Sequence, residues 1–516
     1  MPSTPTMNAA DAVLSPERVA ANPDAIAVLF GDERVSYGEL LARVNRCGNG
    51  LAAQGVEREN RVLLMLKDSP EMIAAYLGAV KIGAVSVALN LRSTPADLLF
   101  FINDSRAKAM LIDAEFLPVY ESIADRVSLP LKVFVSGKHA SRHAGMGELC
   151  RGQSDALAAA AMAPDDMAIW MYTSGTTGTP KGAVHLHRSV LACLHVAQGV
   201  VGATRADRFF STSKLFFAWA NSNSIFASFT LGATTILHDE WPDSAAIAKV
   251  LDRHQPTLFF SVPTLYRNML RDGVATRGRF EGVRHCLSAG ERLPALLFQQ
   301  WQEATGREIV DGLGTTETIF LFLCNRPGDI RPGSSGKPAP RSMVELRDEG
   351  GNVIREPGRP GVLWVKTDSI AERYWNQRDR SRAAFIGPWF RTGDVYVTDP
   401  EGYYFQEGRS DDMLKISGQW VSPAEIEDEV LTLPQVADCA VVGTPNADGL
   451  TRLALFVIPN DPRAEKTALS AGIQEALKRR LSIYKCPREI HLIDEIPRTA
   501  TGKVQRFKLR DQALGK

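Results

Sequence analysis

Residues 172–182 read YTSGTTGTPKG, and this stretch decides how the chain is interpreted. It contains three glycines, four threonines, one serine and the cation of Lys181, with almost no apolar side chain. Glycine lets the backbone turn its N–H groups inward, and the hydroxyls and the ammonium group add donors and charge. The composition therefore predicts a loop that binds a polyphosphate, and an ordinary flexible surface turn is the alternative.

The flanking sequence supports a phosphate-binding loop. The apolar residues 165–172 predict a strand that enters the loop, and residues 187–200 predict a helix after it. The junction between a strand and a helix is where α/β proteins commonly bind phosphate. The loop differs from the GxxxxGK[ST] pattern, because Pro180 rather than glycine precedes Lys181.

Strands alternate with helices along most of the chain, which predicts an α/β fold with mostly parallel sheets. Ser36 and Glu39 form a capping-box pattern at the start of one helix, and a second helix is expected from Ser69. Apolar runs predict strands at residues 24–30, 61–67, 84–89, 107–113, 132–137, 234–239, 257–263 and 285–291.

The residue pattern of the sequence changes twice in the C-terminal part of the chain. Residues 343–408 contain short β-like pieces between Gly and Pro turns, which predicts a β-rich subdomain. A compact α+β unit follows, with a helix expected at 466–481. We therefore expect an N-terminal domain at 1–408, a linker at 409–412 and a C-terminal domain at 413–516.

Composition excludes several classes of protein. Among 516 residues, Lys+Arg and Asp+Glu are both 59, so no nucleic acid or anionic membrane is expected as a partner. The start lacks the features of a signal peptide, and no apolar run is long enough to span a bilayer. Seven scattered cysteines without a CxxC pair predict reduced thiols and a cytoplasmic protein. A monomer or a homodimer is expected.

Five further motifs follow the loop in a fixed order: SAGE (288–291), DGLGTTE (311–317), RTGD (391–394), GRSDDMLKISG (408–418) and PRTATGK (497–503). With the loop, they resemble the acyl-adenylating superfamily, which includes acyl-CoA synthetases, adenylation domains of peptide synthetases and luciferases. Together with KLFFAW (214–219), they most resemble aryl-CoA ligases of the benzoate–CoA ligase type. The resemblance spans nearly the whole chain and implies a large N-terminal domain and a small, mobile C-terminal domain.

The resemblance implies that ATP and Mg²⁺ are bound. Glu317 takes the role of the catalytic Mg²⁺ ligand, and Thr316 donates to the α-phosphate. Asp394 accepts from both ribose hydroxyls, with Arg409 nearby. The remaining nucleotide contacts are implied for the phosphate loop (Thr173, Ser174, Gly175, Thr176, Thr177, Gly178, Lys181) and for the adenine site (Ala289, Gly290, Glu291, Asp311, Gly312).

The C-terminal domain of the resembled family swings between two half-reactions. The match makes Asp411 the hinge, brings Lys503 into the site for adenylation, and places Gly418 beside the path of the coenzyme A thiol. A cation helps because carboxylate and ATP are both anions, and two unit charges 4 Å apart interact by about 4 kcal/mol near a dielectric of 20. A solvated lysine and an acidic linker are the plain alternatives.

The resemblance places a slot for the acid around Phe217, Ala218 and Trp219, which suits a flat aromatic ring. Residues 214–220 lack the Asp with which amino-acid-activating relatives hold an ammonium group. Benzoate ligases often carry His where this chain has Phe320, which favours a substituted ring, and the Trp219 indole N–H is a candidate donor to an ortho or meta group. The opposite wall is expected from Gly314, Ile319 and Phe320, although each aromatic residue also suits a plain core.

Three functions are considered. The first is an AMP-forming aryl-CoA ligase that activates a small aromatic carboxylic acid, such as anthranilate or a hydroxybenzoate, and transfers it to CoA. The second is a stand-alone adenylation enzyme that loads an aryl group onto a carrier protein. The third is a non-catalytic ATP-binding protein, against which Glu317, Asp394 and Lys503 argue.

Overall fold

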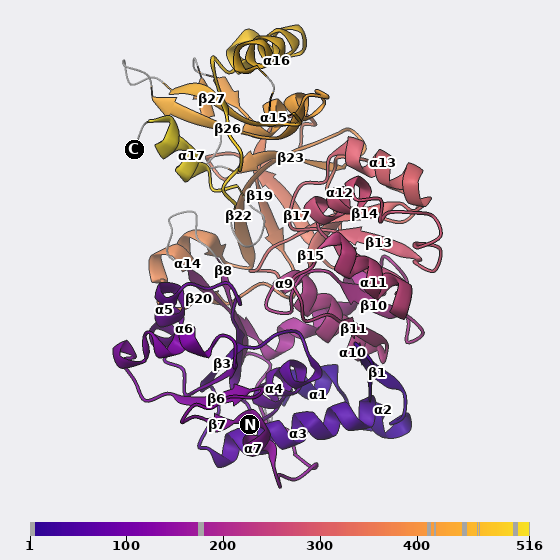
Figure 1. The fold of residues 1–516 in the computed structure, drawn as a ribbon, viewed down its shortest axis with the longest axis vertical. Coiled ribbons are helices and arrows are strands. Elements are labelled where there is room, and N and C mark those ends of the chain that lie inside the picture. The colour runs from indigo at the N-terminus through magenta and orange to yellow at the C-terminus, as the bar shows by residue number, and fades with distance from the viewer. Residues whose placement is uncertain are drawn as a thin grey trace. The chain divides into compact units, whose positions relative to one another are not determined.

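The protein is described from a computed structural model covering residues 6–173, 180–409, 414–416, 419–445, 451–461, 463, 465–498 and 504–514 (Figure 1). Contacts among its Cα atoms divide it into two compact units. The first unit is Met1–Val344 with Val365–Phe390, and the second is Glu345–Trp364 with Arg391–Lys516. Apolar side chains form separate cores in the two units. The domain boundaries expected from the sequence, at 408 and 413, remain a prediction.

An eight-stranded sheet in the first unit carries the strand that leads into the threonine–glycine loop. Its strands β3 to β8 pair in parallel, whereas β8, β9 and β20 pair antiparallel. Strands that are buried on both faces have nearly continuous apolar sequences, as in this sheet. The order is β20 (Arg373–Tyr374), β9 (Lys181–Leu186), β8 (Met167–Thr173), β4 (Val85–Ala88), β3 (Arg61–Met65), β5 (Ala109–Asp113), β6 (Lys132–Ser136) and β7 (Ala144–Gly145).

A nine-stranded sheet forms the other half of the first unit. It is parallel from β1 to β14 and antiparallel at both ends, so the predicted α/β fold with mostly parallel sheets is confirmed. The order is β16 (Lys337–Pro338), β15 (Leu321–Cys324), β14 (Ile309–Gly314), β13 (His285–Ser288), β12 (Leu258–Ser261), β10 (Arg208–Ser211), β11 (Thr234–Leu237), β1 (Ile26–Phe30) and β2 (Glu33–Ser36).

Helices pack on these sheets and begin where the sequence predicts. Ser36 Oγ accepts from the Glu39 N–H at 3.2 Å at the start of α3, and Ser69 Oγ accepts from the Met72 N–H at 3.1 Å at the start of α4. The α-helices of this unit are α1 (Ala9–Val13), α2 (Pro16–Ala21), α3 (Tyr37–Ala53), α4 (Pro70–Lys81), α5 (Pro95–Ser105), α6 (Leu117–Glu121), α7 (Met146–Cys150), α8 (Leu194–Ala197), α9 (Ala218–Ala220), α10 (Ser228–Leu231), α11 (Ser244–His254), α12 (Pro263–Arg271), α13 (Ala295–Thr305) and α14 (Arg378–Ala384). The other helical segments are the 3-10 helices η1 (Ala124–Arg126) and η2 (His187–Cys193) and the π-helix η3 (Asn221–Ala227).

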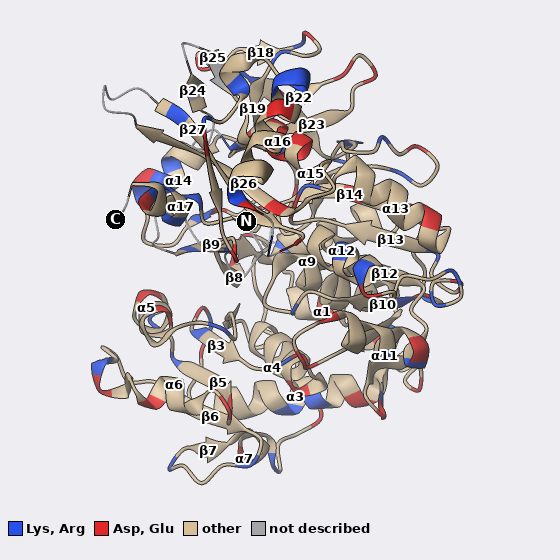
Figure 2. Ribbon diagram, turned by 45° about the horizontal axis from the view of Figure 1, so that its top comes forward, with Lys and Arg blue, Asp and Glu red and all other residues tan. Residues whose placement is uncertain are grey.

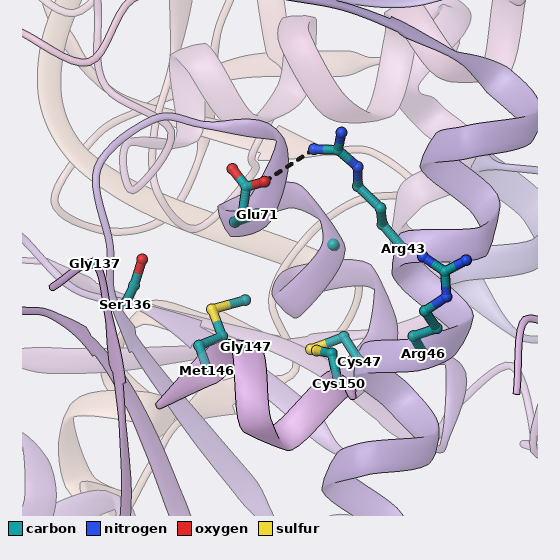
Figure 3. Close-up of a pocket in the computed structure, with 10 residues that line it drawn as sticks. Arg43, Arg46, Cys47, Glu71, Ser136, Gly137, Met146, Gly147 and Cys150 are labelled. Atoms are coloured by element: carbon teal, nitrogen blue, oxygen red, sulfur yellow. Dashed lines mark hydrogen bonds and ion pairs between the residues drawn. The ribbon is translucent and has the colours of Figure 1, made fainter. Parts of the chain in front are cut away.

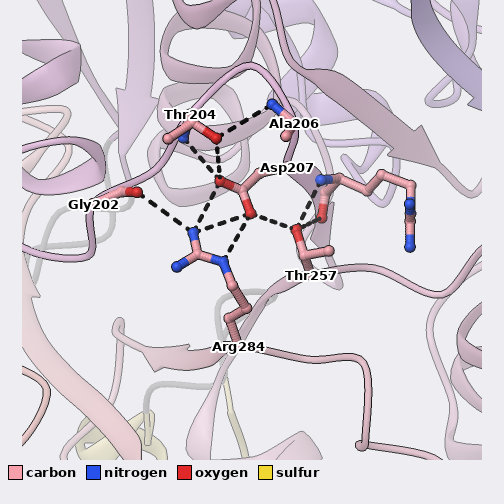
Figure 4. Close-up of polar contacts among 7 residues, drawn as sticks. Gly202, Thr204, Ala206, Asp207, Thr257 and Arg284 are labelled. Carbon is pink, nitrogen blue, oxygen red and sulfur yellow. Dashed lines mark hydrogen bonds and ion pairs between the residues drawn. The ribbon is translucent and has the colours of Figure 1, made fainter.

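A buried carboxylate joins the amino ends of three parallel strands of the larger sheet (Figure 4). Asp207 precedes β10, and its Oδ1 accepts from Thr257 Oγ1, just before β12, at 2.7 Å. Arg284, just before β13, donates to both Asp207 oxygens at 3.0 and 2.9 Å. Although burial opposes it, the Arg284 contact holds the pKa of Asp207 below its usual value. These contacts fix the strand ends opposite to the predicted site.

The second unit contains most of a six-stranded β-sheet and a small α+β region. The predicted β-rich segment forms β17 (Met343–Arg347), β18 (Val353–Ile354), β19 (Gly361–Lys366), β22 (Trp389–Thr398) and β23 (Tyr404–Arg409), with β21 (Phe385–Ile386) at the sheet edge. The α+β region comprises β24 (Leu414–Ile416), β25 (Gln419–Val421), α15 (Pro423–Leu431), β26 (Val436–Pro445), β27 (Thr451–Pro459), α16 (Lys466–Arg480), η4 (Ile483–Lys485), β28 (Glu489–Leu492) and α17 (Arg506–Ala513).

Charged residues are interspersed over both units. Figure 2 shows Lys and Arg mixed with Asp and Glu along most elements, as the equal counts of 59 lead one to expect. Among the described residues, none of the helices combines the length and the apolar composition that a bilayer crossing requires.

Candidate active site

The predicted phosphate loop lies between two antiparallel strands. Thr173, at the end of β8, and Lys181, at the start of β9, are cross-strand partners. The expectation that the loop leads directly into a helix is wrong, because β9 intervenes and the helical turn η2 starts only at His187. The run KGAVHL is short, and it pairs with β8 because its apolar residues complete the buried sheet. The predicted loop residues Ser174, Gly175, Thr176, Thr177 and Gly178 lie outside the described residues.

One tyrosine connects the cation at the base of this loop with the predicted metal ligand. The Lys181 Nζ atom lies 4.7 Å from the centre of the Tyr374 ring. The Tyr374 hydroxyl donates to Glu317 Oε1 at 2.6 Å, and Glu317 is buried. A hydrogen bond to a carboxylate is stronger than one between neutral groups, and it fixes the direction of the carboxylate. We call these three residues the Lys181–Tyr374–Glu317 cluster.

Backbone contacts hold the turn that carries Glu317. The Glu317 carbonyl accepts from the Ala371 N–H at 2.8 Å, and the Thr318 carbonyl accepts from Ser369 Oγ at 2.6 Å. His185 Nε2, on β9, lies 2.9 Å from the Thr316 carbonyl. Burial lowers the pKa of His185 to about 4, so the imidazole is neutral at pH 7 and Nε2 carries the proton that it donates.

The carboxyl ends of two neighbouring strands present polar side chains without partners. Ser288 ends β13, and Asp311 lies beside it in register on β14. Neither the Ser288 Oγ nor the Asp311 Oδ1 has a hydrogen-bond partner among the described residues, although both are buried. Burial raises the pKa of Asp311 well above its ordinary value. Because an unpaired buried acceptor is costly, this oxygen fits a donor such as the amino group of adenine.

The other predicted adenine-site residues have mainly backbone roles. Ala289 is buried, and Gly290 has a φ of +90°, which favours glycine at this turn. The Glu291 carboxylate accepts from the Thr264 hydroxyl at 2.7 Å, so it fixes the start of α12. A side chain at Gly312 would lie 2.8 Å from the Leu323 carbonyl of β15. These residues shape the pocket edge by their backbone.

The predicted ribose pair is assembled within the second unit. Asp394 on β22 and Arg409 on β23 are cross-strand partners, and Arg409 Nη1 lies 3.0 Å from Asp394 Oδ1. Arg409 also donates to the Thr392 carbonyl at 3.2 Å, while the Asp394 N–H donates to Thr392 Oγ1 at 3.0 Å. The structure therefore brings together two residues that are fifteen positions apart in the sequence.

The proposed wall for the acid lies after β10. Phe217, Ala218 and Trp219 are partly buried there, at the start of the helical segment α9–η3. The Trp219 indole N–H donates to the Ser261 carbonyl at 3.2 Å, so the suggestion that it reaches a ring substituent is corrected. The indole lies at the end of β12, edge-on to Phe260 with ring centres 5.6 Å apart. The N–H is therefore used to fix the wall.

A buried ion pair anchors this wall. Asp68 and Lys214 are both buried, and Lys214 Nζ lies 3.8 Å from Asp68 Oδ2. Asp68 Oδ1 accepts from the Leu215 N–H at 3.0 Å, and Lys214 Nζ also donates to the His238 carbonyl. Burial raises the pKa of Asp68 to about 6 and lowers that of Lys214, because desolvation outweighs their attraction.

The opposite wall follows Glu317 directly. Ile319 and Phe320 are buried, and the Phe320 ring packs edge-on to Phe226 with ring centres 6.1 Å apart. Ile319 has a φ of +56°, which is strained for a β-branched residue and is found mostly at functional sites. A side chain at Gly314 would lie 2.9 Å from the Phe320 carbonyl, so glycine is needed where the strands approach.

The remaining predicted residues cannot be placed. Lys503, Asp411 and Gly418 lie outside the described residues. Sequence reasoning missed Tyr374, His185 and Asp68, which contact site residues rather than forming a motif. The only signal for Tyr374 was an aromatic pair in the otherwise polar stretch ERYWNQR.

The site fits a metal that is held jointly with a substrate. Among the described residues, no group of three His, Cys, Asp or Glu side chains is arranged to hold a metal ion. Glu317 offers a buried carboxylate, one oxygen of which accepts a hydrogen bond from the Tyr374 hydroxyl. Mg²⁺ commonly binds through one or two carboxylates together with phosphate oxygens. The residues present therefore match Mg²⁺ bound to a nucleotide, rather than a metal held by protein ligands only.

Comparisons with known proteins agree with this geometry. Residues 16–375 match the model of the family described as AMP-binding enzyme, and residues 425–503 match the AMP-binding enzyme C-terminal domain. The chain is 47% identical to the 3-hydroxybenzoate–CoA ligase of Aromatoleum sp. (strain CIB), over 98% of this chain and 97% of that protein. It is 44% identical to the 3-hydroxybenzoate–CoA/4-hydroxybenzoate–CoA ligase of Thauera aromatica, over 98% and 97%. The crystal structure of the anthranilate CoA ligase AuaEII with anthranoyl-AMP superposes with a TM-score of 0.90 at 35% identity, covering 98% and 97%.

Proposed function

This chain belongs to the AMP-binding enzyme family, and we propose that it activates a hydroxybenzoate, foremost 3-hydroxybenzoate, as its aromatic acid. The chain is an AMP-forming aryl-CoA ligase that works through an aryl-AMP intermediate. Two relatives at 47% and 44% identity are named for 3-hydroxybenzoate, which supports the choice of acid. The observation that carries the chemistry is the Lys181–Tyr374–Glu317 cluster.

In the first half-reaction, an oxygen of the acid attacks the α-phosphorus of ATP. A new P–O bond forms, the bond to the β-phosphate bridge breaks, and pyrophosphate leaves. Lys181 offsets the charge of the phosphates at the base of the loop, while Glu317 and the Thr316 backbone turn are held by Tyr374 and His185. When bound at Glu317, Mg²⁺ supplies positive charge to the phosphate oxygens.

Both ends of the nucleotide have matched groups on this chain. Asp311 offers its unpartnered Oδ1 to the adenine amino group, and Gly290 and Gly312 contribute backbone to this edge of the site. Asp394, already oriented by Arg409, accepts from the ribose hydroxyls. Hydrogen bonds of this kind fix the α-phosphorus relative to the acid, and positioning is a large part of catalysis of phosphoryl-type transfers.

The aryl ring lies between Phe217, Ala218 and Trp219 on one side and Ile319 and Phe320 on the other. In the second half-reaction the CoA sulfur attacks the acyl carbon, a thioester forms, and AMP leaves with the former acyl oxygen. Lys503 is proposed for the first half-reaction and Gly418 for the second, with Asp411 as the hinge between them. The proposed domains are 1–408 and 413–516, with the linker 409–412.

The carrier-protein alternative differs only in the thiol that accepts the acyl group. Both named relatives above use CoA by name, which favours free CoA. No observation on the described residues favours a carrier.

A panel of acids tests the proposed substrate. We expect kcat/KM, measured by pyrophosphate release with CoA present, to be highest for 3-hydroxybenzoate and lower for benzoate, 4-hydroxybenzoate and anthranilate. A site that pairs a substrate hydroxyl usually rejects the analogue without it by more than about tenfold. Equal activity on benzoate and 3-hydroxybenzoate would refute the choice of acid, and pyrophosphate release without thioester formation would favour the carrier alternative.

A further inference from the structure

Two thiols from separate helices meet in a hollow of the first unit (Figure 3). Cys47 lies in the middle of α3, and Cys150 is the last residue of α7. Figure 3 shows the two sulfur atoms next to each other, and each thiol is the largest influence on the pKa of the other. The hollow has a volume of about 340 Å³ and is also lined by Arg43, Arg46 and Met146. None of the described residues of the candidate active site lines it.

The two thiols differ in access and in environment. Cys47 is fully buried, whereas Cys150 is partly exposed to the hollow. Contact with Cys47 lowers the pKa of the Cys150 thiol and the nearby charge of Arg46 adds to this, against opposing contributions from burial and Glu71. The contact with Cys150 and burial raise the pKa of Cys47. The accessible thiol is thus the one with more thiolate character, and the thiolate is the form that reacts.

The surrounding chain keeps the two cysteines together. A side chain at Gly50 would collide with the Leu149 carbonyl, so α7 packs directly against the backbone of α3. The segment after Cys150 is bound to α3 as well, because Asn45 Nδ2 donates to the Asp155 carbonyl at 2.6 Å and Asn49 Nδ2 donates to the Ser154 carbonyl at 2.8 Å. These contacts hold the two segments that carry the thiols against each other.

We propose that Cys47 and Cys150 form a peroxide-reactive pair, in which Cys150 is oxidised first and Cys47 then closes a disulfide. The Cys150 thiolate attacks one oxygen of hydrogen peroxide, the O–O bond breaks, and the departing hydroxide takes a proton to become water. Cys150 is then a sulfenic acid. The Cys47 sulfur attacks the Cys150 sulfur, its proton goes to the leaving hydroxyl group, and a second water is released. The peroxide is reduced by two electrons, and the two thiols are oxidised to one disulfide.

Mass spectrometry of the full-length protein tests this pair. After exposure to hydrogen peroxide and blocking of free thiols, non-reducing digestion is expected to yield the Cys47–Cys150 cross-linked peptide, which disappears when a dithiol reductant is added. In Cys47→Ala, dimedone is expected to label Cys150 several-fold more than in the wild type, because the sulfenic acid has no partner. Arg46→Gln is expected to slow the reaction several-fold, since the cation near Cys150 is removed.

Cys486 provides the matched control. It is also partly exposed, but burial raises its pKa even though the charge of Lys478 acts to lower it. Cys486→Ser is expected to leave cross-linking unchanged. The proposal is overturned if Cys486 is oxidised at peroxide concentrations that leave Cys150 reduced, or if dimedone labels Cys150 equally in the wild type and in Cys47→Ala.

Discussion

At the scale of single residues, the account depends on Tyr374, which touches both charges of the site. Its ring lies under the Lys181 ammonium group and its hydroxyl holds one oxygen of Glu317. The motifs identified Lys181 and Glu317, because their residue types are needed for phosphate and metal. They gave no reason to select Tyr374, since a residue that only orients another has no fixed chemical type.

Replacing Tyr374 with phenylalanine keeps the ring and removes the hydroxyl. The Glu317 carboxylate then loses a hydrogen bond of the charged kind, worth about 1.5–3 kcal/mol, so the adenylation rate is expected to fall roughly 10–100-fold. The Mg²⁺ concentration for half-maximal rate is expected to rise, because Glu317 is no longer oriented. Pyrophosphate release over a Mg²⁺ titration measures both effects.

Tyr120→Phe is the control for that variant, since Tyr120 is a buried tyrosine that packs in another core of the same unit. It is expected to match the wild type. A Tyr374→Phe enzyme with wild-type rate and wild-type Mg²⁺ dependence would remove the cluster from the mechanism.

At the scale of elements, the sequence predicted the positions of most strands and helices but not all of the contacts between them. Apolar runs and Ser caps were sufficient for β3, β4, β5 and the starts of α3 and α4, because local pattern and burial agree there. The strand β9 was missed, since its six residues are fixed by pairing with β8 rather than by a pattern of their own. Only the suggested use of the Trp219 indole N–H was wrong, for a similar reason, because the Ser261 carbonyl that accepts from it comes from a distant strand.

The element that carries Phe217 and Trp219 is expected to respond to pH through Asp68. Burial raises the pKa of Asp68 from 3.8 to about 6. Lys214 acts to lower this pKa and Asp239 acts to raise it, but burial has the largest effect. The folded state therefore binds this proton more tightly than the unfolded chain, so stability rises as pH falls through about 6 and the gain is complete below about 4. At pH 5 the gain is about 1 kcal/mol, or roughly 2 °C in the thermal midpoint.

Thermal unfolding of the wild type and of Asp68→Asn at pH 7.5 and pH 5 measures this contribution. The asparagine variant does not titrate, so the midpoint of the wild type is expected to rise relative to that of the variant on acidification. Parallel changes in the two proteins would mean that Asp68 does not take up a proton in this range.

At the scale of the whole molecule, the order of the motifs predicted more than any single motif. Two family models match the chain: the AMP-binding enzyme model matches 16–375, and the model of its C-terminal domain matches 425–503. Asp394 and Arg409 are both assigned to the ribose from that order; they pair with each other within the second unit, and their role toward the ribose stays a prediction. The identity of the acid could not be predicted from the sequence alone, because core residues and pocket-lining residues such as Phe320 have the same composition.

The two half-reactions are expected to separate when Lys503 is replaced. In Lys503→Ala, formation of aryl-AMP is expected to fall by about three decades, since an interaction of about 4 kcal/mol in the transition state is lost. The attack of CoA on supplied 3-hydroxybenzoyl-AMP is expected to continue, because Lys503 is assigned to the first half-reaction only. The two half-reactions are distinguished by measuring thioester formation from the acid and from the synthetic adenylate in one preparation. Equal loss of both activities would refute the assignment.

The exchange of labelled pyrophosphate into ATP in the absence of CoA tests the central claim most directly, that the Lys181–Tyr374–Glu317 cluster organises formation of an aryl-AMP. We predict exchange that requires both 3-hydroxybenzoate and Mg²⁺, proceeds without CoA, and is lost in Glu317→Gln. Exchange at the wild-type rate in Glu317→Gln, or exchange that appears only when CoA is added, would contradict the account.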